Sequence, residues 1–243
     1  MSCFQEVGLR ANPVQLARNT AVERITAVRS GCLPFQLEKT PKLLVDIVPL
    51  HEQDVRMKLI EAERSKLAVG VPVLGANVES PRYLGNGVYF YSVSGATGLV
   101  RAYVAYYHYG GTEACRCLPE ITHSPSRMIP SRDLTERLVI SFDDCLDIQK
   151  ALVVEPPLLT FLGLVDAEGF TFTASNDKYA SDRSKTITGG CWITSGYVRV
   201  DDYDFPSDIE ERRRKLYVIL KPLLDDLWRS AGFPKSPDHD IFQ

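Results

Sequence analysis

Aromatic and basic residues are concentrated between residues 82 and 109, where seven of the eleven tyrosines lie. Because side chains alternate along extended strands, most of these tyrosines are expected on one face of a sheet. Such a face can stack bases while neighbouring cations hold phosphates, as in sheet-based single-strand binders. The alternative is a half-buried amphipathic face whose tyrosine hydroxyls reach water at its edge. The candidate nucleic-acid-binding residues are Arg82, Tyr89, Tyr91, Arg101, Tyr103, Tyr107, His108 and Tyr109.

Two cysteines and two histidines are the residue types that metal or thiol chemistry would use. Cys115 and Cys117 are expected on the same face of one strand, with His108 before them and His123 after them. A zinc site needs four converging ligands, and this spacing is not that of a zinc ribbon or knuckle. A Cys–His nucleophile pair is a second interpretation. Buried, inert cysteines are the third, and the sequence favours it.

Acidic pairs occur at three separate places in the chain. Adjacent carboxylates on a helix diverge by about 100°, so each pair is expected to be solvated rather than to form a metal cage. If the fold brought such acids together with histidines, they would make a metal-dependent hydrolase or nuclease, which is the alternative function. No intact catalytic motif is present, so the sequence predicts no catalytic residue, no metal site and no cofactor, and it favours a non-enzymatic role. The pairs are Asp143-Asp144, Asp201-Asp202 and Asp225-Asp226.

The overall charge limits the kinds of partner that the chain can bind. Its 243 residues carry a formal net charge of −3, so nucleic-acid binding would have to use a local basic patch. The one dense basic run, Arg212 to Lys215, follows Glu210 and Glu211 and is expected to form i,i+4 ion pairs on a solvated helix face. No apolar run approaches the roughly 20 residues of a membrane helix. Six scattered cysteines suggest reduced thiols, and hence a cytoplasmic protein.

The elements that would position these residues interleave without a regular strand–helix alternation. This pattern predicts an α+β fold with a mostly antiparallel sheet, in which a tyrosine-rich meander packs with three to four helices. Residues 1–12 are expected to be a tail and residues 13–243 a single domain. The predicted helices cover 13–30, 52–67, 131–152 and a last helix after Ser207, and the predicted strands cover 43–48, 88–93, 99–109, 112–118, 158–165, 170–172 and 197–200.

Local signals set the ends of several of these elements. Asn12-Pro13 reads as an N-cap followed by a first-turn proline, and Gly31 is expected to end that helix. Ser207 and Glu210 read as a capping box at the start of the last helix, with a kink at Pro222. Residues 70–81 and 175–185 are expected to be loops. The apolar stripe of the last helix is predicted to be Ile209, Leu216, Leu220, Leu223 and Leu227.

An ordered set of short motifs suggests a family. The set consists of Arg24-Ile25, Gly31-Cys32-Leu33-Pro34, Ile47-Val48-Pro49-Leu50, Pro81-Arg82, Asn86-Gly87, Tyr103-Val104, Gly111-Thr112-Glu113, Glu155-Pro156-Pro157, and the ending from Leu223 to Phe233 with Lys235-Ser236-Pro237. With these motifs, the chain from about Ala21 onward resembles the C-terminal region of bacterial proteins that carry an N-terminal Schlafen-AlbA-type DNA-binding domain. Those proteins are often labelled ATP-binding or helix-turn-helix proteins.

The resemblance implies an accessory or interaction module of a nucleic-acid-linked regulator. The family's Schlafen-AlbA-type domain would lie before Ala21, and about twenty residues precede that position here. Relatives tend to have a histidine before the Pro-Leu pair, where this chain has Asp46. The implied partners are nucleic acid, a partner protein or Schlafen-AlbA-type domain, and a second copy of the chain, while no membrane partner is expected. No catalytic residue is carried over from the family.

Overall fold

An antiparallel sheet of eight strands lies at the centre of the computed structural model, in the order β12-β9-β1-β7-β6-β5-β4, with β13 also paired to β9. The structure describes residues 12–51, 53–59, 72–73, 76–77, 79–118, 128–173, 184–189, 191–194 and 196–236. The strands of this sheet are β1 (Lys42–Pro49), β4 (Glu79–Leu84), β5 (Gly87–Val93), β6 (Val100–Tyr107), β7 (Thr112–Cys117), β9 (Leu158–Val165), β12 (Cys191–Ile193) and β13 (Val198–Val200). The predicted α+β fold with a mostly antiparallel sheet is confirmed.

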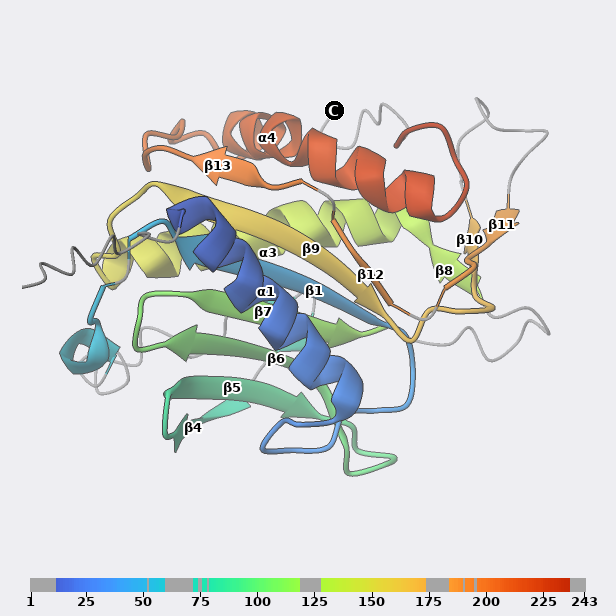
Figure 1. Cartoon of the computed structure of the whole chain (residues 1–243), viewed down its shortest axis with the longest axis horizontal. Helices are drawn as coiled ribbons and strands as arrows, with labels where there is room; N and C mark the ends of the chain where they lie inside the picture. The colour runs from blue at the N-terminus through green and yellow to red at the C-terminus, as the bar shows by residue number, and fades with distance from the viewer. Residues whose placement is uncertain are drawn as a thin grey trace, which may run out of the picture.

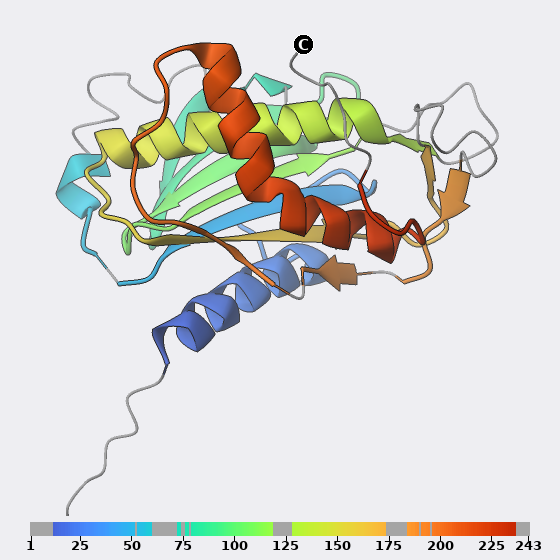
Figure 2. The same ribbon diagram turned by 90° about the horizontal axis from the view of Figure 1, so that it is seen from above.

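Helices cover both faces of this sheet. Helix α1 (Pro13–Ser30) crosses one face diagonally, over β9, β1 and β7 (Figure 1). Helices α3 (Ser131–Ala151) and α4 (Ile209–Ser230) lie on the opposite face, and Figure 2 shows the sheet edge-on between α1 and these two helices. Five short strands lie outside the main sheet. These are β2 (Pro72–Val73) paired with β3 (Ala76–Asn77), and β10 (Thr171–Thr173) between β8 (Met128–Pro130) and β11 (Ser184–Thr186).

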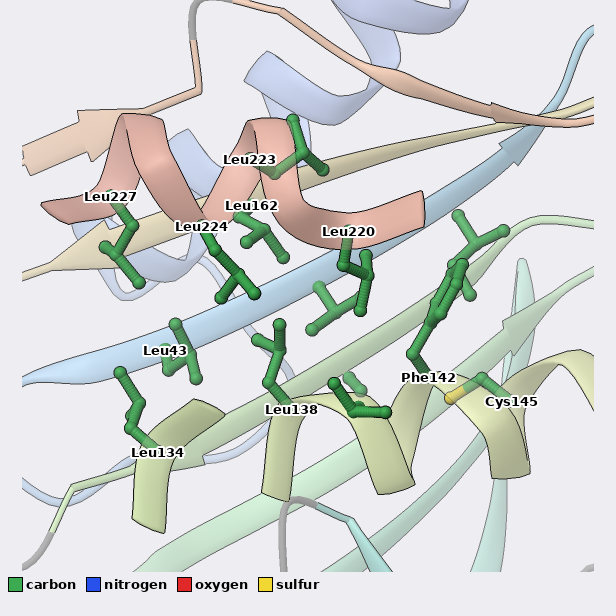
Figure 3. Packing of buried hydrophobic residues seen from close by; sticks show 14 of the residues in the cluster. Leu43, Leu134, Leu138, Phe142, Cys145, Leu162, Leu220, Leu223, Leu224 and Leu227 are labelled. Carbon is green, nitrogen blue, oxygen red and sulfur yellow. The ribbon is translucent and has the colours of Figure 1, made fainter. Parts of the chain in front are cut away.

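The larger apolar core fills the space between the sheet and helices α3 and α4. Leucines of α4, among them Leu220 and Leu224, meet Leu138 and Phe142 of α3 above the sheet residue Leu43 (Figure 3). All eight residues of β1 are buried, because its odd-numbered residues up to Ile47 face this core while Leu44 faces α1. A fully buried side chain of this size typically contributes about 1.5–3 kcal/mol, so this core accounts for much of the fold's stability.

Most of the predicted elements are confirmed, and their ends follow local signals. Asn12 caps α1 by accepting from the Val14 amide, and Gly31 ends the helix in the left-handed region at φ 70°. The meander of β5, β6 and β7 agrees with the predicted strands to within two residues at each end. Pro222 lies inside α4, as predicted.

Five predictions about local structure need correction or lie partly outside the described residues. The predicted loop at 70–81 contains β2, β3 and the start of β4. Asp208, not Ser207, caps α4, because its carboxylate accepts from the Glu210 and Glu211 amides. Ile209, at the first turn of α4, is half exposed and does not belong to the core stripe. Of the predicted helix at 52–67 only 53–59 are described, with 56–59 helical, and most of 175–185 also lies outside the described residues.

Among the described residues, no helix is both long enough and apolar enough to cross a membrane.

Candidate functional site

The tyrosine face of the sheet is covered by α1 and by the segment that follows it. Tyr89, Tyr103 and Tyr107 are each at most 2% exposed. The ring of Phe35 packs against those of Tyr89 and Tyr103, with centroids 5.9 and 5.1 Å away. The guanidinium of Arg24, from α1, lies 4.6 Å from the Tyr107 ring centre. These three rings therefore do not present a stacking surface to solvent in this conformation.

A carboxylate beneath α1 binds the polar groups of this face together. Glu113 of β7 is fully buried, and its two oxygens accept two hydrogen bonds of 3.2 Å from Arg24. The hydroxyls of Tyr103 and Tyr107 donate to the same carboxylate at 2.6 and 3.0 Å. Burial, and then the charge of Glu113, raise the pKa of both tyrosines well above the usual value, so their hydroxyls stay protonated and can donate. The charge of Glu113 is thus compensated inside the protein.

A second carboxyl group lies directly beside the first. Asp46 of β1 is the cross-strand partner of Glu113 and is 2% exposed. Burial, and then the negative charge of Glu113, raise the pKa of Asp46 well above its usual range, against an opposing effect of Arg24. Asp46 Oδ2 has no hydrogen-bond partner among the described residues. We call Arg24, Asp46, Tyr103, Tyr107 and Glu113 the closed polar cluster.

The other candidate residues are dispersed over three places. Arg82 is exposed at the sheet edge, with its guanidinium 5.2 Å from the centre of the half-buried Tyr91 ring. His108 and Tyr109, both half-buried, lie beyond β6 in a hollow of about 600 Å³. Tyr109 stacks on Tyr107 with the ring centres 5.3 Å apart and the planes 3° from parallel. The fold therefore does not bring the eight candidates onto one open surface.

Arg101 points away from the tyrosine face because of an irregularity in the sheet. Ser92 pairs with Ala102 and Val93 with Val100, so Arg101 is an extra residue on β6, as in a β-bulge. Its Nε donates to Ser92 Oγ at 3.0 Å. Ala102 belongs to the core under α3, and Ser92 is two residues after Phe90 of the same core. The bulge therefore turns Arg101 toward the side of the sheet that carries α3.

Two more arginines lie on the same side, and we call Arg101, Arg116 and Arg137 the arginine cluster. Arg116 of β7 pairs across the sheet with Ala102, so its side chain is on the α3 side. Arg137 is an exposed residue of α3. Partial burial, and then the charges of Arg137 and Arg101, lower the pKa of Arg116. The positive charges of Arg101 and Arg137 are thus close enough to Arg116 to disfavour its charged form.

The residues proposed for metal or thiol chemistry are engaged in other ways. Cys115 and Cys117 are buried, and burial raises the pKa of Cys117 to about 11, so neither is a ready thiolate. Acidic side chains from each of the three pairs contact nearby cations, namely Asp143 with Arg212, Asp201 with Arg199, Asp225 with Lys221 and Asp226 with Arg229. The described residues hold no group of three or more His, Cys, Asp or Glu placed to bind a metal ion, and His123 lies outside them.

The sequence-based site omitted every charged residue of the two clusters apart from Arg101. Asp46 could have been noticed as the one acid within the apolar strand 43–48. Glu113 and Arg24 carried no such signal, because they are 89 residues apart and meet only in the folded chain. Arg116 and Arg137 were likewise missed, since only the packing of α3 on β7 brings them near Arg101.

Comparison with protein families, with curated proteins and with solved structures finds no match to this chain.

Proposed function

We propose that this protein is a non-enzymatic accessory module of a nucleic-acid-linked regulator, and that it contacts nucleic-acid phosphates through the arginine cluster. The observation that carries the proposal is the gathering of Arg101, Arg116 and Arg137 on one side of the sheet. Arginine donates in a planar fork that matches phosphate oxygens, and it stays charged at all physiological pH values. A phosphate chain would relieve the mutual repulsion of the three cations.

The choice of nucleic acid as the anion has two supports. The resemblance to Schlafen-AlbA-type proteins points to a nucleic-acid-linked role. The chain as a whole carries a net charge of −3, so a polyanion is attracted only where cations are concentrated locally. Of the eight candidate residues derived from the sequence, Arg101 is the one that belongs to this cluster, and the buried tyrosines have no part in the contact that we propose.

Fluorescence anisotropy with short single-stranded and duplex oligonucleotides, at low and moderate salt, tests the proposal. We expect salt-sensitive binding that weakens in Arg101→Ala, Arg116→Ala and Arg137→Ala. Each lost phosphate contact should reduce the slope of log K against log salt by about 0.7 for single strands or 0.9 for duplex. Arg199→Ala, which removes an exposed arginine paired with Asp201, is the matched control and should bind like the wild type.

Two results would rule the proposal out. One is the absence of salt-sensitive binding to either oligonucleotide. The other is binding whose affinity and salt slope are the same in the three cluster variants as in Arg199→Ala. Tyr107→Phe keeps the buried ring but removes the hydroxyl that donates to Glu113. It should leave binding unchanged if the tyrosine face takes no part.

A further inference from the structure

The closed polar cluster contains two carboxyl groups, Asp46 and Glu113, and a single cation, Arg24, whose charge acts on both of them. Glu113 and Asp46 are directly opposite each other on β7 and β1, and both are buried. Arg24 makes its two hydrogen bonds to Glu113. The titratable groups near the pair on β6 and at its end are the hydroxyls of Tyr103, Tyr107 and Tyr109, and burial raises the pKa of all three. The Cys115 thiol of β7 also lies near Asp46, and burial raises its pKa as well. On its other side Asp46 pairs with Phe161 of β9, which carries no charge.

The two carboxyl groups differ in the number of donors that reach them. Glu113 accepts from Arg24 twice, from Tyr103 and from Tyr107, and four donors are what a carboxylate needs in a site without water. Asp46 has a buried oxygen with no donor among the described residues. Ionising Asp46 would place a second negative charge there, and an uncompensated buried charge is strongly unfavourable. The neutral form of Asp46 therefore fits this site.

We propose that Asp46 and Glu113 hold a single proton between them in the folded protein, and that this proton stabilises α1 in its position on the tyrosine face. When α1 leaves the sheet, water reaches both carboxyl groups, and Asp46 ionises with an ordinary pKa of about 3.9. Closing the helix over the sheet then takes up one proton. The covered state of Tyr89, Tyr103 and Tyr107 becomes a function of pH.

The sign of this dependence follows from proton linkage. The pKa of Asp46 in the closed state is raised above its value in the open state. The contribution of Asp46 to closure is therefore fully present below about pH 4, and it is lost as the pH rises from there toward the pKa of the closed state. Within that window one proton is taken up on closing, so the equilibrium constant for opening rises about tenfold per pH unit. Above the closed-state pKa the dependence levels off.

Amide hydrogen exchange of α1 between Ala21 and Val28, corrected for the intrinsic effect of pH, measures this opening. The informative variant is Asp46→Asn, whose amide is close in shape to a protonated carboxyl and cannot ionise. We expect the opening constant of the wild type, relative to that of Asp46→Asn, to rise about tenfold per pH unit above pH 4. Asp201→Asn, at an exposed ion pair, is the control and should follow the wild type.

Equal pH dependence in the wild type and in Asp46→Asn would overturn the proposal, because both carboxyl groups would then be ionised in the closed state. Should Asp46→Asn fail to fold, the carboxyl ¹³C shift of Asp46 in the wild type decides the question. A shift that stays at its protonated value through neutral pH supports the shared proton. A titration centred near the ordinary value of about 3.9 contradicts it.

Discussion

The closed polar cluster and the arginine cluster lie on opposite sides of the same sheet. The first pairs opposite charges, whereas the second brings like charges together. Beneath α1, Arg24 and Glu113 form a buried ion pair whose remaining acceptor capacity is filled by tyrosine hydroxyls. On the α3 side, Arg101, Arg116 and Arg137 bring like charges together. The first arrangement compensates charge within the protein and so serves the fold. The second gathers like charges from three elements on one side of the sheet, and this is the side on which we propose that an external anion binds.

Aromatic content alone does not show whether a sheet face is open to solvent. Tyr103 and Tyr107 are aromatic residues of the kind that nucleic-acid-binding sheets display, yet their hydroxyls point to Glu113 and their rings contact Phe35 or Arg24. Here the tyrosines carry buried hydrogen bonds. The arginine cluster contains no tyrosine, and what distinguishes it is that all three of its side chains are positively charged.

The largest effect on stability is expected from breaking the closed polar cluster. Glu113→Ala should lower the free energy of unfolding by about 3–5 kcal/mol, because it leaves the guanidinium of Arg24 and two tyrosine hydroxyls beneath α1 without their acceptor. Urea denaturation measures the loss. Asp201→Ala, which breaks an exposed pair with Arg199, is the control, and its loss should stay below about 1 kcal/mol. Similar losses in the two variants would mean that Glu113 does not hold α1 in place.

A smaller effect is expected from crowding the contact between α1 and the sheet. Ala21 is fully buried in a cluster with Leu159 and Phe161 of β9, so a larger side chain would have to displace close-packed neighbours. Ala21→Leu should therefore lower the free energy of unfolding by about 1–3 kcal/mol. Val22→Leu changes the next residue, which is partly exposed, and should have little effect. If thermal or urea unfolding showed both variants to be equally stable, the close approach of α1 to β9 would be in doubt.

The smallest effect, and one of opposite sign, is expected in the arginine cluster. Arg137→Ala removes one of three mutually repelling charges, so stability at low salt should be unchanged or rise by up to about 0.5 kcal/mol. Added salt should remove any difference from the wild type, because it screens exposed charges. Arg199→Ala, which removes a partner of Asp201, should not stabilise the protein. A clear loss of stability in Arg137→Ala, measured by urea denaturation at low salt, would show that Arg137 is compensated within the fold.

Local sequence signals were sufficient for the helices α1, α3 and α4 and for the longer central strands, but not for β4, β8, β11 or β12. Asn12, Pro13 and Gly31 mark both ends of α1 because capping and the left-handed region act on neighbouring residues. The alternation in 88–93 and 99–109 predicted the paired strands β5 and β6. The signals were weaker where the competing residues are adjacent, as with Ser207 and Asp208, either of which can cap α4. The bulge at Arg101 has no comparable signal, and it changed the face on which a candidate residue lies.

By itself, the sequence determined helices α1, α3 and α4, the longer central strands and the shared face of Tyr103 and Tyr107, since these follow from contacts between near neighbours in the chain. Only the tertiary structure decided that α1 covers this face, that Arg24 meets Glu113 from 89 residues away, and that three arginines of β6, β7 and α3 gather on the opposite side. Burial and charge compensation depend on every element that packs around a residue. A single strand or helix therefore does not reveal whether its polar side chains serve the fold or an external partner.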